Sequence, residues 1–271
     1  MSMLPLLIEP AELQKHLHDP DLLIVDMCKH SQYQQVHIHG AVFLDYSYIT
    51  AVNRPAMGLL PDEEQISKVL SAIGFTSNSH VVAYDEEGGG KAARLIWTLH
   101  ALGHFKTSLL NGGLISWYKE KHPVTAESTR VTDVPCKVKY TNMNVIADVR
   151  YILGHLDDPK VALLDARSLG EYTGEKRYAE RAGRIPGAKH FEWTEGMDPQ
   201  HNYRLLPNDV LQKKLNTLGL TPDKEIIVYC QTHHRSAFSY FMLKQLGYEK
   251  VRGYPGSWSD WGNRLDTPIE I

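Results

Sequence analysis

An internal duplication runs through the chain and limits its fold more than any other feature of the sequence. Short segments of the first half recur in the second half in the same order and at nearly the same spacing. The matched segments are 22–26 with 161–165, 37–41 with 184–188, 60–61 with 206–207, 81–85 with 226–230, and 112–117 with 256–261. Chance does not produce such an order, so the chain consists of two repeats of one structural unit.

Each repeat has the pattern of an α/β fold. Apolar runs that predict buried strands lie at 22–25, 81–84 and 107–110, and then at 161–164, 225–229 and 250–252. Segments with helical periodicity alternate with them, at 62–73, 91–102, 208–218 and 236–246. Strands that alternate with helices form parallel sheets, because each connection crosses back over the sheet. We therefore predict two tandem α/β domains, each a mostly parallel sheet flanked by helices on both faces.

The two repeats define the predicted domain boundaries. The first domain is expected to span 1–126 and the second 143–271. The segment 127–142 between them has no regular period and is rich in Thr, Val and Lys, so we interpret it as a linker. With 271 residues, of which 42% are hydrophobic, the chain is long enough for two domains with well-formed cores.

The composition argues against nucleic-acid and membrane partners. The formal net charge is −3, which does not predict a basic surface for a nucleic acid or an anionic membrane. No apolar run approaches the roughly 20 residues that a membrane-spanning helix needs. The segment 1–17 lacks the basic and then apolar order of a signal peptide, so we expect a cytoplasmic protein.

Three widely separated cysteines are present: Cys28, Cys136 and Cys230. Their odd number and their spacing argue against a disulfide framework and against a Cys-x-x-Cys metal or redox site. We assign no chemistry to Cys28 and Cys136, because a lone cysteine is usually a small apolar core residue. His37 and His39 form a His-x-His, but the second repeat has no histidine at the equivalent turn, so we predict no metal site.

Residues that both repeats retain are expected to be structural. Asp26 and Asp165 end equivalent strands, which favours capping or pairing with a nearby arginine. Trp117 and Trp261 are expected to pack in the two cores. The glycines at 88–90 lack the Lys-Ser/Thr ending of a phosphate-binding loop, so no nucleotide cofactor is predicted.

The repeats differ at the loop where chemistry is expected. In α/β sheets, ligands gather beyond the carboxyl ends of the strands. The second loop reads Cys-Gln-Thr-His-His-Arg-Ser over 230–236, and its counterpart reads Asp-Glu-Glu-Gly-Gly-Gly-Lys over 85–91. The first loop has Asp85 in place of the nucleophile and carries three carboxylates that repel anions. We therefore predict that the second repeat is catalytic and that the first is supportive.

The chemistry of the second loop favours an anion at Cys230. A free thiol has a pKa of about 8.5, and a helix amino terminus lowers that pKa, because unpaired N–H groups and the helix dipole favour negative charge. A short turn from strand to helix directs several N–H groups at one point, which suits a thiolate, a persulfide or an oxyanion. Arg235 adds a fixed positive charge, and His233 and His234 add further positive charge when protonated.

These features together resemble the tandem-domain rhodaneses, or thiosulfate sulfurtransferases. The resemblance covers nearly the whole chain and rests on Asp-Ala-Arg at 165–167, Gly-Arg-Ile-Pro-Gly-Ala at 183–188, Tyr-Cys at 229–230 and Gly-Ser-Trp at 256–258. Members of this family have an inactive amino-terminal and an active carboxy-terminal rhodanese-like domain. The replacement of Cys230 by Asp85 in the first repeat agrees with that division.

The resemblance implies a two-step sulfur transfer without a metal or an organic cofactor. Cys230 is expected to take the outer sulfur of thiosulfate as a persulfide, release sulfite, and pass the sulfur to cyanide, a thiol or a protein acceptor. The loop amides are expected to hold the transferred sulfur and Arg235 to attract the donor. The substrate-binding residues implied are Gln231, Thr232, His233, His234 and Arg235.

Departures from the family pattern leave alternatives open. Mercaptopyruvate enzymes place an arginine where this chain has Glu171, which weakens that assignment. The dual-specificity cell-cycle phosphatases resemble this fold, but they need a Cys-x5-Arg loop, whereas Cys230 and Arg235 form a shorter Cys-x4-Arg loop. A module that delivers sulfur or selenium to a partner protein would use the same loop as an enzyme.

Overall fold

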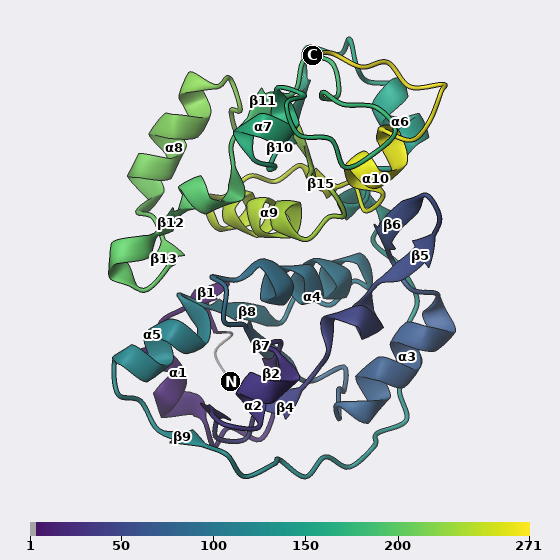
Figure 1. The fold of residues 1–271 in the computed structure, drawn as a ribbon. Coiled ribbons are helices and arrows are strands. Elements are labelled where there is room, and N and C mark those ends of the chain that lie inside the picture. Colours follow the sequence, from purple (N-terminus) through teal and green to yellow (C-terminus); the bar gives the residue numbers. More distant parts are fainter. Residues whose placement is uncertain (1–3) are drawn as a thin grey trace. The chain divides into compact units, whose positions relative to one another are not determined.

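The computed structural model describes residues 4–271, and these residues form two compact units (Figure 1). Unit 1 contains 4–49, 61–141 and 197–205, and unit 2 contains 50–60, 142–196 and 206–271. The predicted domains 1–126 and 143–271 are continuous stretches of sequence. Each unit, by contrast, also includes one short segment from the other stretch.

A five-stranded parallel sheet forms the centre of unit 1. Its strand order is β1-β8-β7-β2-β4, and every neighbouring pair is parallel. The strands are β1 (Leu7–Ile8), β2 (Leu22–Asp26), β4 (Val42–Phe43), β7 (His80–Tyr84) and β8 (Thr107–Leu110). The three strands predicted for the first repeat are thus confirmed as β2, β7 and β8.

Helices cover both faces of this sheet. Ile24 and Val82 lie on one face and pack with residues of α1 (Pro10–His16) and α5 (Gly113–Lys119), including Trp117. Successive strand residues point to opposite faces, so the buried Val25 and Ala83 face the other side. There α4 (Gly90–Ala101) packs on β7 and β8. The two helices predicted for the first repeat are confirmed as α3 (Glu63–Ala72) and α4.

Unit 2 contains a four-stranded parallel sheet with the order β11-β10-β14-β15. Its strands are β10 (Val161–Asp165), β11 (Lys189–His190), β14 (Glu225–Tyr229) and β15 (Val251–Gly253). β10 and β14 are aligned so that Asp165 lies beside Tyr229 at their carboxyl ends. The residue after Tyr229 is Cys230, so the thiol directly follows the carboxyl end of β14, where the strand pattern of the sequence predicts it.

Both faces of the second sheet are also covered. Leu163 and Ile227 pack with Trp258 and Trp261 of α10 (Ser257–Trp261) and with α6 (Val149–Leu153). On the opposite face, α9 (Arg235–Gln245) packs on β14 and β15. The remaining helices of unit 2 are α7 (Leu169–Tyr172) and α8 (Asn208–Thr217). The predicted α/β class and the core positions of both tryptophans are confirmed.

Two hairpins occupy equivalent places in the two repeats. The hairpin of β5 (Ala51–Asn53) and β6 (Ala56–Leu59) follows the 3-10 helix η1 (Tyr46–Ile49), and β6 packs on α10 within unit 2. The hairpin of β12 (Met197–Asp198) and β13 (Arg204–Leu205) follows η3 (Trp193–Gly196) and encloses η4 (Pro199–His201). It belongs to unit 1.

The predicted linker adopts an extended path with no helix or strand between 127 and 142. It runs along α3 of unit 1, where the N–H groups of Val138 and Val134 donate to Ser67 Oγ at 3.1 Å and to the Ser71 carbonyl at 3.2 Å. The neighbouring short elements are η2 (Met143–Val145) and β9 (Val124–Thr125), and β9 pairs antiparallel with β3 (His37–Ile38) after α2 (His30–Tyr33).

His37, the first histidine of the His-x-His motif, has a structural role. His37 is buried, and its Nδ1 hydrogen bonds to the Tyr33 carbonyl at 2.6 Å. Among residues 4–271, no group of three or more His, Cys, Asp or Glu side chains is arranged to hold a metal ion. Nor does any helix in that range have the length and apolar character needed to cross a membrane.

The core of unit 2 yields a stability prediction. Trp261 is fully buried and its Nε1–H donates to the Pro268 carbonyl at 2.8 Å. Trp261→Ala should lower the free energy of unfolding of unit 2 by about 3–5 kcal/mol, because it leaves a cavity and an unpaired carbonyl. Urea unfolding followed by circular dichroism measures this change. Leu265→Ala, at a side chain 96% exposed, is the control and should leave the unfolding free energy unchanged.

Candidate active site

The loop 230–234 connects β14 to α9 at the carboxyl edge of the second sheet. Cys230 is the first residue of this loop and is 1% exposed. Its side chain lies at the amino terminus of α9, where the first N–H groups of the helix have no partner within the helix. The strand and the helix together fix the position of the thiol.

The surroundings of Cys230 favour the thiolate. Burial alone raises the pKa of this thiol, but the positive charge of Arg235 opposes that effect. The hydroxyl and N–H of Ser236 and the N–H of Thr232 also stabilise the negative sulfur by hydrogen bonding. The net result is a pKa below the ordinary value of a cysteine. The loop is therefore suited to a nucleophilic sulfur.

Hydrogen bonds to α10 hold the loop in place. Ser257 Oγ accepts hydrogen bonds from the N–H groups of Cys230 at 3.2 Å and His233 at 3.1 Å, and donates to the Tyr254 carbonyl at 2.8 Å. The Trp258 N–H donates to the Cys230 carbonyl at 2.9 Å. His233 itself has a positive φ of 55°, an unfavourable conformation that these contacts hold in place. The Gly-Ser-Trp segment at 256–258 indicated this region, but sequence reasoning did not assign Ser257 a role.

Arg235 is held by a carboxylate that sequence reasoning had placed only at a specificity position. The guanidinium donates two hydrogen bonds to Glu171, from Nη1 at 2.7 Å and from Nη2 at 2.8 Å. Glu171 also accepts from the hydroxyl of Ser168 at 2.8 Å in a capping box that opens α7. The bidentate pair fixes the plane of the guanidinium beside the loop.

This ion pair changes the pKa of both partners. Burial raises the pKa of the Glu171 carboxyl, but the hydrogen bonds and charge of Arg235 outweigh burial and lower it to about 2. Burial lowers the pKa of Arg235, and Glu171 together with the Cys230 thiolate raises it above its ordinary value. Arg235 is therefore a permanent cation, shared between the carboxylate and the sulfur.

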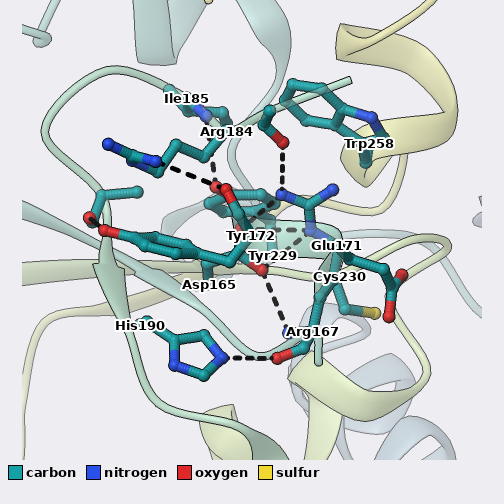
Figure 2. A network of polar contacts seen from close by, with 12 residues as sticks. Asp165, Arg167, Glu171, Tyr172, Arg184, Ile185, His190, Tyr229, Cys230 and Trp258 are labelled. Atoms are coloured by element: carbon teal, nitrogen blue, oxygen red, sulfur yellow. Dashed lines mark hydrogen bonds and ion pairs between the residues drawn. The ribbon is translucent and has the colours of Figure 1, made fainter. Parts of the chain in front are cut away.

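A second charged network lies at the base of the site (Figure 2). Arg167 pairs with Asp165, with Nη2 at 2.6 Å from Oδ2, and also donates to the Gly183 carbonyl at 2.8 Å. The guanidinium carbon of Arg167 lies 4.5 Å from the ring centroid of Trp258. The prediction that Asp165 pairs with a nearby arginine is confirmed. This buried pair ties the end of β10 to α10, which in turn pins the Cys230 loop.

The other predicted site residues lie on the same loop with different surroundings. Gln231 Nε2 donates a hydrogen bond to the Tyr178 carbonyl at 3.0 Å, which fixes the orientation of the Gln231 amide. His233 is fully buried, and its Nδ1 lies 2.8 Å from Ser236 Oγ. His234 precedes α9, and its ring centroid is 5.7 Å from that of Trp193. A substrate-binding role for Gln231, His233 and His234 stays a prediction.

The equivalent loop of unit 1 holds an anion of its own. The fully buried Asp85 carboxylate accepts hydrogen bonds from the N–H groups of Glu87 at 3.0 Å, Gly89 at 2.8 Å and Ala92 at 3.0 Å. Burial and the neighbouring Glu87 raise the pKa of Asp85 to about 6, although these N–H groups lower it. The loop of unit 1 thus also directs backbone N–H groups at an anion, which here is a carboxylate in place of a sulfur.

Comparison with known proteins shows the family of this chain. Residues 9–120 and 148–264 match the family model described as a rhodanese-like domain, and the chain belongs to this family. It is 43% identical over 270 residues to a thiosulfate sulfurtransferase of Azotobacter vinelandii, covering 100% of this chain and 98% of the relative. A thiosulfate sulfurtransferase of Pseudomonas aeruginosa is 41% identical with the same coverage. The resemblance to the tandem-domain rhodaneses is confirmed.

Two further comparisons bear on function and fold. A sulfur carrier protein, TtuD, of Thermus thermophilus is 33% identical, over 95% of this chain and 93% of the relative. The structure of an anaerobic ergothioneine biosynthesis enzyme from Chlorobium limicola superposes with a TM-score of 0.87 at 22% identity, covering 98% of this chain and 70% of that one. At that identity the likeness is one of fold.

The Glu171–Arg235 pair predicts a pH-dependent contribution to stability. A carboxyl whose pKa is lower in the folded than in the unfolded chain stabilises the fold above its unfolded pKa, and this contribution is lost as the pH falls through the folded pKa. For Glu171, with an ordinary value of 4.5 and a folded value of about 2, the window is between those two values. Glu171→Gln should therefore lower the unfolding free energy at neutral pH by on the order of 3 kcal/mol.

Urea unfolding at neutral pH and at about pH 3 measures the difference in unfolding free energy between the wild type and Glu171→Gln. This difference should be smaller at the lower pH. Glu270→Gln is the control, because Glu270 pairs with Arg184 but its side chain is 45% exposed. That variant should lose less than about 1 kcal/mol. An equal loss for Glu171→Gln at both pH values would show that the ion pair does not stabilise the fold.

Proposed function

We propose that this protein is a sulfurtransferase that moves the outer sulfur of thiosulfate to cyanide or a thiol through a persulfide on Cys230. The proposal rests on one observation above all. Backbone N–H groups between strand and helix stabilise an anion in both units, and that anion belongs to a thiol of lowered pKa in unit 2 but to a carboxylate in unit 1. A cradle that stabilises an anion at a nucleophile is what sulfur transfer requires.

In the first step the Cys230 thiolate attacks the outer sulfur of thiosulfate. A new S–S bond forms to Cys230 Sγ, the S–S bond of thiosulfate breaks, and sulfite leaves with the bonding electron pair. The N–H groups of Thr232 and Ser236 stabilise negative sulfur before and after transfer, because both the thiolate and the persulfide are anions. Arg235 attracts the dianionic donor and stabilises the negative charge of the departing sulfite.

In the second step the acceptor attacks the terminal sulfur of the persulfide. With cyanide, a C–S bond forms, the S–S bond to Cys230 breaks, and thiocyanate leaves while the Cys230 thiolate is regenerated. A thiol acceptor in its thiolate form gives a persulfide of the acceptor by the same displacement. Neither step changes the net charge at Cys230, so one fixed cradle serves both.

The relatives support thiosulfate as the donor, since two of them at 41–43% identity are thiosulfate sulfurtransferases over their whole length. Delivery of the sulfur to a protein acceptor is a second candidate function. It is favoured by the likeness to the sulfur carrier protein of Thermus thermophilus. Both functions use the same persulfide, and turnover of the loaded protein by cyanide separates them. The cytoplasmic location stays a prediction.

The persulfide itself is directly testable. Incubation of the wild-type protein with thiosulfate should increase the intact mass by one sulfur atom, and addition of cyanide should remove it. Cys230→Ser should show no gain and no thiocyanate formation, because a hydroxyl has neither the acidity nor the sulfur needed. Cys136→Ser is the matched control and should load like the wild type. Loading of the Cys230→Ser variant would refute the assignment of the nucleophile.

The charge of Arg235 should act mainly on donor binding. Arg235→Ala should raise the KM for thiosulfate about tenfold or more, because a hydrogen bond to a charged group contributes about 1.5–3 kcal/mol. That variant also leaves Glu171 buried without its cation, so Arg235→Ala/Glu171→Gln is measured beside it to remove this complication.

Steady-state thiocyanate formation gives the KM for thiosulfate of Arg235→Ala and of the double variant. The single variant Glu171→Gln serves as the control. Since Glu171→Gln keeps the guanidinium charge, its KM for thiosulfate should stay within about threefold of the wild type. A wild-type KM in the double variant would show that the backbone N–H groups hold the donor without Arg235.

A further inference from the structure

The hairpin β5–β6 makes an unusually close contact with the catalytic loop inside unit 2. Gly58 of β6 has a φ of +72°, and a Cβ atom built on it would lie 2.0 Å from the Thr232 carbonyl oxygen and 2.7 Å from the carbonyl carbon. Real Cβ atoms do not approach other atoms so closely. Only glycine therefore allows the backbone of β6 to lie directly against the backbone of the loop.

The peptide bond that Gly58 contacts is held from its other side as well. In a trans peptide the carbonyl and the N–H point in opposite directions. The Thr232 carbonyl is directed at Gly58, and the N–H of the same peptide, which belongs to His233, donates to Ser257 Oγ at 3.1 Å. The peptide plane between Thr232 and His233 is consequently clamped between β6 and α10.

A second set of contacts anchors the hairpin at this place. The Met57 N–H donates to Ser259 Oγ at 2.9 Å, and the N–H of Ser259 donates to the Gln231 carbonyl at 3.0 Å. Ser259 is nearly fully buried on α10, so these bonds are shielded from water. The hairpin, α10 and the loop residue next to Cys230 thus form one continuous set of hydrogen bonds.

We propose that the hairpin β5–β6 sets the shape of the Cys230 loop, and that Gly58 is a positioning residue for sulfur transfer. This inference rests on the proposed function and deepens it. The Thr232 N–H faces the sulfur, and Thr232 is the residue on which Gly58 packs. Any displacement of Thr232 moves one of the donors that stabilise the thiolate and the persulfide.

The first unit also contains a close contact between a hairpin and the equivalent loop. There the hairpin β12–β13 packs on the Asp85 loop, and a Cβ built on Gly88 would lie 2.7 Å from Met197 Sδ. In that case the loop supplies the glycine and the hairpin supplies the side chain. The contact between hairpin and loop is therefore a property of both repeats, although the residues that make it differ.

Gly58→Ala tests the proposal, and Gly219→Ala is its matched control. Gly219 lies in the same unit with a nearly identical φ of +71°, but a Cβ there would meet nothing within 4 Å. Both variants therefore carry the same backbone strain, and only Gly58→Ala pushes on the loop. The readouts are kcat for thiocyanate formation and the pKa of Cys230, measured from the pH dependence of its alkylation by iodoacetamide.

Gly58→Ala should lower kcat about tenfold or more and raise the pKa of Cys230, because a donor to the sulfur moves away. Gly219→Ala should leave both within about twofold of the wild type. Ser259→Ala, which keeps Gly58 but loosens the hairpin, should shift both in the same direction as Gly58→Ala and by less. It also provides the test if Gly58→Ala does not fold.

The outcomes separate this inference from the proposed function. If the wild-type protein takes up no sulfur from thiosulfate, the proposed function fails. If the wild type is active but Gly58→Ala matches Gly219→Ala in kcat and in the pKa of Cys230, the positioning role is overturned. An unchanged Ser259→Ala variant beside an unfolded Gly58→Ala variant would likewise show that the hairpin contributes only to stability.

Discussion

A ring of backbone N–H groups around a buried anion is the interaction on which both units depend. It forms where a central parallel strand ends and a helix begins, so strand and helix together fix the directions of the N–H groups. In unit 1 three of these groups hold the Asp85 carboxylate, and in unit 2 the N–H groups of Thr232 and Ser236 stabilise the Cys230 sulfur. Both loops place backbone N–H groups around an anionic side chain at the start of a helix, and that side chain is a carboxylate in unit 1 and a thiol in unit 2.

The ring in unit 2 needs support because it contains strained backbone and several charges. His233 has a positive φ and is held through Ser257. The cation of Arg235 is balanced by Glu171 on one side and by the sulfur on the other, so neither charge is buried alone. In the proposed reaction, the dianionic donor would therefore meet a site without a large excess of positive charge.

The α/β class, the central strands and the position of Cys230 could be predicted from the sequence. The duplication aligns the strands of the two repeats and shows that Asp85 stands in the first repeat where Cys230 stands in the second. Each of these features can be recognised within a short segment of sequence or by comparing matched positions of the two repeats. The Glu171–Arg235 pair, the role of Ser257 and the contact of Gly58 with Thr232 could not be predicted, since each joins residues far apart in the sequence. Neither hairpin has a strong periodic pattern, and nothing in a single sequence indicates which unit a short hairpin joins.

The first repeat contributes to both units although its own loop carries Asp85 in place of a thiol. Asp85 satisfies the N–H groups of its loop with its own carboxylate, so unit 1 keeps its fold without a bound sulfur. The segment 50–60, encoded in the first repeat, is part of unit 2 and lies against its catalytic loop. If Gly58 positions the Cys230 loop as proposed, the first repeat takes part in sulfur transfer through β6, although its own loop carries no thiol.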